Sequence, residues 1–279
     1  MSRPSDEAYA ELIRRVKSIV LLNSCGSILH WDHQTYMPVK GAAHRAEQLA
    51  LVAGLAHDQF TRPEIGDLLS RAEEGSARKG PGSAAAVNVR EIHRAYDRAM
   101  RVPPALVEEL ARTAALAQDV WVEARRASDF GRFRPWLEKL VALKRQEAKA
   151  VSAGGLLYDA LLDEYEPGET VERLTPVFGA LRKSLVDLVG RIAGSPKRPD
   201  LSILHRAYPI AAQEAFGKTV VAAFGFDFQA GRLDVTTHPF CSGIGPGDTR
   251  LTTRYNPHDF GDGFFSILHE AGHGLYDQG

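Results

Sequence analysis

Apolar residues recur at every third or fourth position through most of the first 225 positions, and this spacing restricts the fold more than any other feature. Near the start, Leu12, Val16 and Ile19 fall on one face of a helix, because an α-helix turns once in about 3.6 residues. Within the segment 170–194, Pro176 predicts a kink or a boundary. The spacing predicts helices over about 5–29, around 46–53, and over 61–75, 84–100, 105–128, 134–151, 170–194 and 211–225.

The pattern changes after Phe226, where the helical spacing stops. Segments 231–237 and 249–255 alternate in polarity and are rich in Thr and Val, which is typical of strands. The residues between them, 241–248, are rich in Gly and predict a turn-rich connection. The sequence therefore predicts a mainly α fold over 1–279, a single multi-helix domain with a small β-ribbon before one last helix.

Two segments between the helices are expected to be loops. The stretch 76–83 combines Gly, Ser and charged residues, and it predicts the most flexible loop of the chain. The stretch 30–38 mixes aromatic and polar residues without helical spacing, and it predicts a packed loop in which Trp31 is hydrogen-bonded. Asp32 and His33 lie in this stretch as conceivable metal ligands, but the packed loop is the preferred interpretation.

The bulk composition excludes several classes of protein. The 279 residues include 34 basic and 35 acidic side chains, so no net field attracts nucleic acid or an anionic membrane. No stretch approaches the roughly 20 apolar residues that a membrane span needs. Cys25 and Cys241 are too few and too far apart for a disulfide framework, which favours a reducing, cytoplasmic location.

The last predicted helix begins near Phe264, with Asp259 or Asp262 as its cap. The apolar run "FFSIL" favours a helix that is buried on one side. Gly272 and Gly274 each cost about 1 kcal/mol in helix propensity, a cost that is tolerated where another group must come close.

This helix carries the motif His269-Glu270-Ala271-Gly272-His273. Residues four apart lie on the same helical face, so His269 and His273 can bind one metal ion. Glu270 is rotated by about 100° from His269 and can instead take a proton from a metal-activated water, as a general base. The motif predicts a metal-dependent hydrolase. The alternative is a polar helix face that carries two solvated histidines.

A catalytic zinc site needs a third protein ligand. Asp277 lies one turn beyond His273, and its rise of about 12 Å from His269 excludes shared coordination. His238, Asp248 and His258 remain open as alternatives, and the sequence does not choose among them.

The ribbon carries a second group of polar residues. Asp248, Arg250 and Thr252 alternate along "DTRLTTRY" and share one face of the predicted strand. An ordinary hairpin with a solvated face is preferred over a strand that pairs with an extended peptide. His238 precedes a proline, which fixes an extended backbone, and Phe240 is expected in the core or in a pocket wall.

Several motifs occur together in a fixed order along the chain. They are "WDHQTYMP" followed by "AEQLA", then "VPPALVEEL", "ASDFGRFRPWLEKLVALKR" and "YDALLDEYEPG", then the HPF residues 238–240, the D-x-R-x-T residues 248–252, and the helix 269–273 followed by "GLYDQG". By these motifs the chain resembles the carboxypeptidase Taq family, also called thermostable carboxypeptidase 1, over essentially its whole length.

The resemblance implies a zincin-like helical fold with a deep groove, usually as a homodimer. It implies a metallocarboxypeptidase that releases single C-terminal residues from peptides with broad specificity, using zinc or another divalent metal such as cobalt. His269 and His273 would be metal ligands and Glu270 the general base. The residues implied to line the substrate groove are His238, Phe240, Asp248, Arg250 and Thr252.

The resemblance also implies that the domain is incomplete at its C-terminal end. Family members continue past this helix, and their third metal ligand is a glutamate on a later helix. The chain alone is therefore expected to bind metal poorly and to show little activity, because loss of one ligand of three weakens zinc binding.

Two other functions remain open. If the chain is a non-catalytic helical scaffold or a partner-binding remnant, Glu270→Gln should leave every measured property unchanged. If it is part of a carboxypeptidase, the same substitution should abolish turnover in a completed chain. A metalloendopeptidase with the same helix predicts cleavage of peptides whose C-terminus is blocked.

Overall fold

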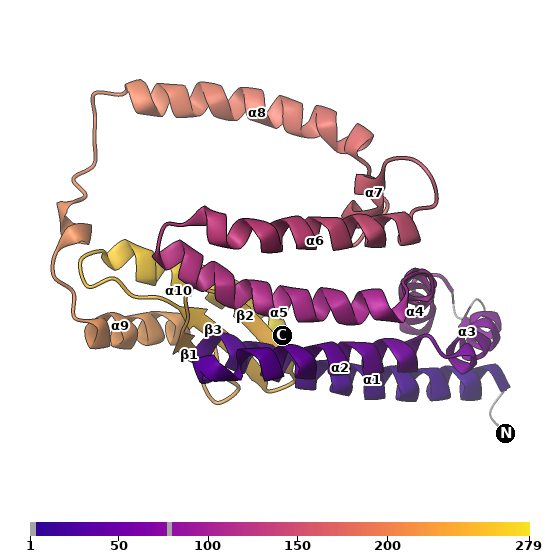
Figure 1. The fold of residues 1–279 in the computed structure, drawn as a ribbon. Coiled ribbons are helices and arrows are strands. Elements are labelled where there is room, and N and C mark those ends of the chain that lie inside the picture. Colours follow the sequence, from indigo (N-terminus) through magenta and orange to yellow (C-terminus); the bar gives the residue numbers. More distant parts are fainter. Residues whose placement is uncertain (1–3, 77–79) are drawn as a thin grey trace.

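The computed structural model describes residues 4–76 and 80–279, and the fold within them is mainly helical, as predicted. Figure 1 shows the long helices as successive layers, with a small sheet at one end of the molecule. The helices are α1 (Pro4–Thr35), α2 (Ala42–Phe60), α3 (Pro63–Ser76), α4 (Ala84–Arg101), α5 (Pro104–Arg126), α6 (Phe130–Val151), α7 (Leu157–Leu162), α8 (Val171–Gly194), α9 (Ile210–Ala223) and α10 (Phe260–Gln278). Short 3-10 helices lie at Val39–Gly41 and Ser202–His205.

The prediction of a loop over 30–38 is wrong, because α1 continues to Thr35. The polar residues that break the apolar spacing have partners on other helices. Arg45 of α2 donates to Asp32 at 2.7 Å, and His33 lies 2.9 Å from a carboxylate oxygen of Asp119 on α5. These side chains are anchored by polar contacts, so the helix needs no apolar stripe there.

Pro176 does not end α8, although a boundary or kink was expected there. The helix begins after Thr170, whose side chain accepts a hydrogen bond from the backbone N–H of Arg173 at 3.2 Å. Pro176 is the sixth residue of the helix and leaves one carbonyl of the first turns without its usual donor. The helix nevertheless continues to Gly194.

The sheet has three strands, β1 (Gly231–Val235), β2 (Cys241–Gly245) and β3 (Asp248–Thr253), in the order β1-β3-β2. β1 is parallel to β3, with Leu233 opposite Leu251, and β2 is antiparallel to β3. The prediction of a simple two-stranded ribbon is therefore corrected. The segment expected to be a turn-rich connection forms β2, and only its last residues make the turn into β3.

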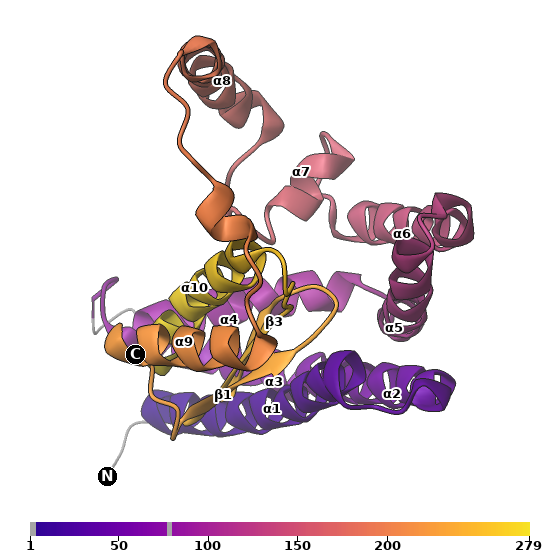
Figure 2. The ribbon, with the colours of Figure 1, turned by 90° about the vertical axis from the view of Figure 1, so that its left-hand side faces the viewer.

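Two groups of buried apolar residues hold the body together. The first lies where the N-terminal half of α1 packs on α3 and α4, and it includes Leu12, Leu69 and Val89. The second lies between the sheet, α9 and α10, and it includes Leu251 and Ile267. α1 reaches both regions, because its C-terminal half packs beside the sheet (Figure 2).

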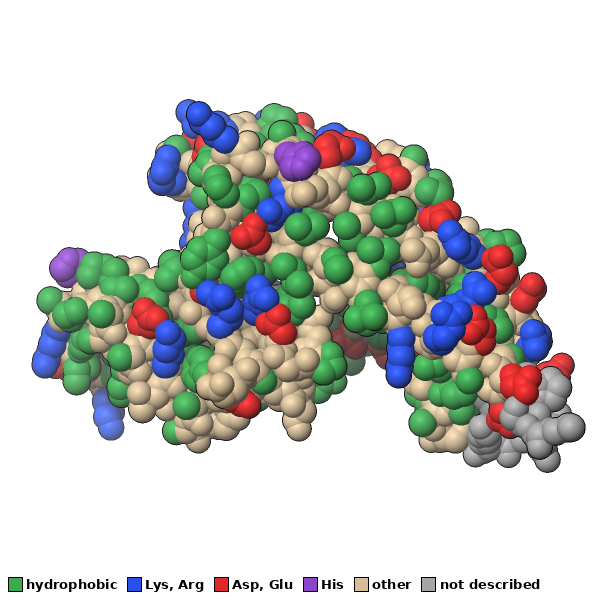
Figure 3. Space-filling view, turned by 90° about the horizontal axis from the view of Figure 1, so that it is seen from below, with side chains coloured by type: hydrophobic (Ala, Val, Ile, Leu, Met, Phe, Trp, Pro, Cys, Tyr) green, Lys and Arg blue, Asp and Glu red, His purple; other side chains and the backbone are tan. Residues whose placement is uncertain are grey.

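The loop prediction over 76–83 falls partly outside the described residues, since 77–79 are not described. Ser76 closes α3, and Ser83 caps α4 by accepting from the backbone N–H of Ala86 at 3.3 Å. None of the helices in the described part of the chain combines the length and hydropathy of a membrane crossing. On the described part of the face seen in Figure 3, acidic and basic side chains are interspersed.

Candidate metal centre

α10 begins at the cap that the sequence predicted. The side chain of Asp259 accepts hydrogen bonds from the backbone N–H groups of Gly261 at 2.9 Å and Asp262 at 3.3 Å. Of the two predicted caps, Asp259 is therefore the one used, and the helix starts four residues earlier than Phe264. The carboxylate satisfies two of the N–H groups that the first turn leaves open.

One face of α10 is buried against β3 and the residues around it. Ile267, Ala271 and Gly274 lie on this face, next to Leu251 and Phe226. A Cβ atom on Gly274 would lie 2.7 Å from Cδ2 of Leu251, so any larger residue would force the buried side chains of Leu251 and Phe226 to shift. A Cβ atom on Gly272 would meet nothing within 4 Å. The close approach expected at both glycines occurs at Gly274 alone.

His269 and His273 lie on the other side of α10, about 200° and 240° around the helix from Ile267. Their ring centroids are 5.1 Å apart, with the ring planes at 81°. Two imidazoles that bind one ion at about 2.1 Å and near-tetrahedral angles have centroids about 5 Å apart. The two rings therefore fit a shared divalent metal. Both His269 and His273 are exposed.

Glu270 lies between the buried face and the histidine face, and it is only 7 % exposed. Among the described residues, its carboxylate has no hydrogen bond or ion pair, so its oxygens are free to accept a proton. Cys241 of β2 lies nearby. Burial, with the charges of Asp277 and Glu270, raises the pKa of the Cys241 thiol to about 12.

The structure brings no third ligand to the two histidines. No group of three or more His, Cys, Asp or Glu side chains among residues 4–76 and 80–279 can hold a metal ion. His238 instead packs edge-on against Trp121, with ring centroids 6.1 Å apart. Asp248 accepts from Arg250, and His258 is exposed. None of the three residues that the sequence left open completes the site.

Phe240 and Thr252, two of the predicted groove residues, are joined directly. The hydroxyl of Thr252 accepts from the backbone N–H of Phe240 at 2.7 Å and donates to its carbonyl at 2.8 Å. Thr252 is fully buried. It therefore fixes the backbone of the HPF segment against the central strand. The side chain of Phe240 lies near His30, with ring centroids 6.2 Å apart.

Arg250, another predicted groove residue, faces α1. Its guanidinium carbon lies 4.2 Å from the centroid of the Trp31 ring, and that of Arg232 lies 5.0 Å from the same ring. The indole N–H of Trp31 is buried without a partner among the described residues, so the predicted hydrogen bond to Trp31 is wrong. β3 is also paired on both edges, which leaves no free edge for an extended peptide.

His238 lines a cavity of about 280 Å³ beside α5. Its other walls are mostly apolar and include Trp121, Phe133 and Leu140. The sequence placed His238 in the groove but did not predict these neighbours, because they come from α5 and α6, about 100 residues earlier.

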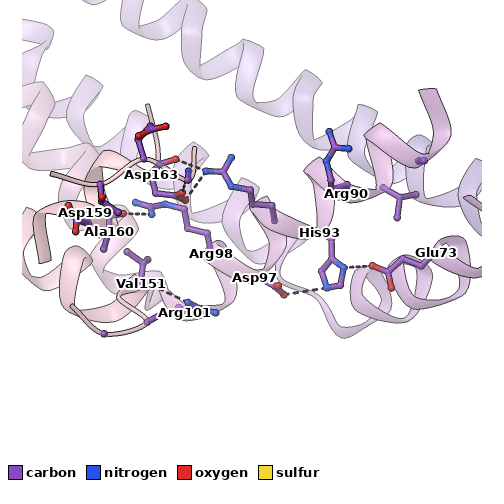
Figure 4. A pocket seen from close by; sticks show the side chains of 18 residues that line it. Glu73, Arg90, His93, Asp97, Arg98, Arg101, Val151, Asp159, Ala160 and Asp163 are labelled. Atoms are coloured by element: carbon purple, nitrogen blue, oxygen red, sulfur yellow. Dashed lines mark hydrogen bonds and ion pairs between the residues drawn. The ribbon is translucent and has the colours of Figure 1, made fainter. Parts of the chain in front are cut away.

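A larger cavity, of about 790 Å³, lies away from these residues, between α3, α4 and the segments around α7 (Figure 4). His93 stands between Glu73 and Asp97, and Arg98 donates to the carbonyl of Ala160 at 2.9 Å. None of the predicted site residues lines it. Arg94 pairs with Asp163 on its far side at 2.7 Å.

Comparisons with known proteins agree with the motifs. The sequence model described as carboxypeptidase Taq (M32) metallopeptidase matches residues 11–279. The chain is 45% identical to thermostable carboxypeptidase 1 of Thermus thermophilus over 283 residues, which are 98% of this chain and 56% of that protein.

Solved structures share the fold. The M32 carboxypeptidase from Deinococcus radiodurans R1 is 35% identical with a TM-score of 0.81, over 98% of this chain and 54% of that one. The structure named "BsuCP Crystal Structure" is 31% identical with a TM-score of 0.92, again over 98% and 54%. The chain thus spans about half the length of the relatives that it matches.

Proposed function

Since this chain belongs to the carboxypeptidase Taq (M32) metallopeptidase family, we propose that it supplies part of the catalytic site of a metal-dependent carboxypeptidase. The complete enzyme would release single C-terminal residues from peptides with broad specificity. The observation that carries the proposal is the pair of imidazole rings, 5.1 Å apart on one face of α10, with the buried carboxylate of Glu270 beside them.

His269 and His273 would hold the metal through one ring nitrogen each. A divalent metal, when bound, polarises the peptide carbonyl and acidifies a water molecule. The carboxylate of Glu270 takes the proton from the attacking water and passes it to the leaving amine. Its lack of any other hydrogen bond among the described residues supports this role.

The remaining ligand would come from residues outside this chain. The support is the lack of a third ligand among the described residues and the length of the relatives, of which this chain spans about half. The chain alone would therefore bind metal weakly and turn over little or no peptide. Zinc or cobalt as the metal, a cytoplasmic location, a single domain and a homodimer belong to the same proposal.

Metal binding is the first test, because it needs no turnover. Equilibrium dialysis of the chain against zinc should show weak binding that His269→Ala and His273→Ala each abolish. His205→Ala, at an exposed histidine on a 3-10 helix, is the control and should leave binding unchanged. Tight stoichiometric zinc in the unaltered chain, together with turnover, would overturn the proposal of an incomplete site.

Turnover is tested in a completed chain, in which the unmatched part of the Thermus thermophilus relative follows residue 279. This protein should hydrolyse an N-blocked dipeptide with a free carboxyl terminus, and Glu270→Gln should abolish hydrolysis. Glu64→Gln, at an exposed carboxylate of α3, should not. Equal activity of the Glu270→Gln protein would favour a non-catalytic scaffold. Cleavage of the same peptide with a C-terminal amide would favour an endopeptidase.

A further inference from the structure

α8 presents an apolar face that the described part of the chain does not cover. Leu174, Phe178, Leu181, Leu185 and Ile192 fall within one stripe, since they are spaced by threes, fours and sevens. Val177, Leu188 and Val189 lie along the same stripe, which spans about a third of the helix circumference. The opposite face carries charged residues. An amphipathic helix of this kind is stable only when its apolar face packs on another surface.

The stripe is open to solvent. Its large side chains from Val177 to Ile192 are between 47 % and 61 % exposed, and α8 contains no buried residue. Figures 1 and 2 both show α8 set apart from α6, and α8 has no extensive contact with another helix or strand of the described chain. A row of exposed apolar residues of this length marks a binding surface.

A second apolar surface lies on α6 and α7. A cavity of about 460 Å³ is walled by apolar side chains, which include Leu140, Val141 and Leu161. Its rim is basic. Arg145 and Lys149 stand there without an ion-pair partner among the described residues, whereas Lys144 contacts Glu147 at 2.7 Å. A partner that fills this cavity would therefore combine apolar residues with acidic ones.

We propose that the α8 stripe and the α6–α7 cavity form a docking surface for the helical polypeptide that makes up the rest of the carboxypeptidase in the relatives. The spacing of the stripe fits another helix, because apolar residues at alternating steps of three and four pack against a second helix of the same pattern. The relatives contain such additional chain, since this chain covers only 54–56% of them. The docking segment would be an amphipathic helix with an acidic margin.

The inference rests on the proposed function in so far as both require the remaining part of the enzyme. It differs in what it assigns, namely a surface remote in sequence from His269 and His273. Its test measures binding and not catalysis, so the docking proposal and the catalytic proposal can be contradicted independently. A protein that docks normally but has no activity would contradict only the catalytic proposal.

The test mixes the full 279-residue chain with the unmatched part of the Thermus thermophilus relative, produced as a separate polypeptide. Light scattering and titration calorimetry measure the complex. The stripe is altered by Leu181→Glu and Leu185→Glu, each at an exposed position, and the matched control on the opposite face is Lys183→Glu. Circular dichroism checks that each variant keeps its helix content.

A one-to-one complex is expected, and each stripe variant should weaken it by about tenfold or more, since buried apolar anchors dominate such interfaces. The control should change the affinity by less than about threefold. Equal affinity of the stripe variants and the unaltered chain would overturn the proposal. It would also be overturned if two copies of this chain alone formed a dimer that the stripe variants dissociate.

The separate polypeptide can fail to fold, so a second measurement uses the completed chain described above. Hydrogen exchange of the α8 amides is compared between that protein and the 279-residue chain. Docking predicts slower exchange across α8 in the completed chain, and Leu185→Glu should reverse the protection. Unchanged exchange of α8 in a folded completed chain would contradict the docking surface.

Discussion

The guanidinium carbon of Arg250 lies 4.2 Å from the centroid of the Trp31 ring, and Asp248 holds the same guanidinium with contacts of 2.7 and 2.8 Å. This contact joins the central strand to the C-terminal half of α1, across more than 200 positions of sequence. β3 in turn carries Leu251, on which α10 packs. Arg250 is thus a positioning residue for the strand on which α10 packs.

Arg250→Met should destabilise the protein by about 2 kcal/mol, because the side-chain stem is kept while the cation above the indole ring is lost. The ion pair adds less, since Asp248 is partly exposed to solvent. Urea unfolding measures the change. Arg206→Met, at an exposed arginine, is the control and should stay within about 0.5 kcal/mol. Equal effects at both positions would mean that the stacking contributes nothing.

Thr252→Val should cost about 1–3 kcal/mol, because the backbone N–H of Phe240 loses its acceptor, while the Phe240 carbonyl keeps only its hydrogen bond from the backbone N–H of Thr252 at 2.9 Å. Thr252→Ser keeps the hydroxyl and should recover most of the loss. Thermal unfolding of both variants gives the comparison, with Thr219→Val, at an exposed position of α9, as the control. A Ser variant as unstable as the Val variant would show that the methyl group matters instead.

Gly274→Ala and Gly272→Ala should change stability in opposite directions. The first forces a Cβ atom to within 2.7 Å of Leu251 and should cost about 1–3 kcal/mol. The second meets nothing within 4 Å and should gain up to about 1 kcal/mol in helix propensity. Urea unfolding of both variants measures the two changes in the free energy of unfolding. Similar effects of the two substitutions would contradict the packing described for α10.

Iodoacetamide at pH 8 should alkylate Cys25 and leave Cys241 largely unmodified. Cys25 is exposed, whereas burial raises the pKa of Cys241 to about 12. At pH 8 a thiol of that pKa is ionised to about one part in ten thousand, and the thiolate is the reactive form. Mass spectrometry of tryptic peptides measures both rates, and unfolded protein, in which both react, is the control. Comparable rates in the folded chain would disprove the burial of Cys241.

The helices could be predicted from the sequence because their signal is local. The spacing of apolar residues found α5, α6 and α9, and residue type limited the cap of α10 to Asp259 or Asp262, of which Asp259 is the one used. The last turns of α1 were missed because His33 and its polar neighbours are held by residues of α2 and α5. The residues around His33 in the sequence do not predict those partners.

The two histidines of the proposed metal site followed from spacing alone, because positions 269 and 273 are one turn apart on the same helix. The order of the strands could not be predicted from the sequence. β1 pairs in parallel with β3 although β2 lies between them in the sequence, and the glycine-rich sequence of β2 is typical of a turn. The contact between Arg250 and Trp31 also escaped prediction, although both residues lie in motifs of the family. A contact between segments far apart in the sequence does not produce a regular spacing of residue types, so it cannot be predicted from that spacing.

α1 is a single helix of 32 residues, about 48 Å long, and it contributes to the first group of buried residues and contacts the sheet beside the second. Leu12 sits in the first group, and Trp31 meets Arg250 beside the second. Inserting one residue between them would turn everything downstream by about 100° and swing the indole away from the arginine. Between Leu12 and Trp31, substitutions of surface residues are therefore tolerated in evolution. Insertions or deletions there are not, because they would change the number of residues between the two contacts.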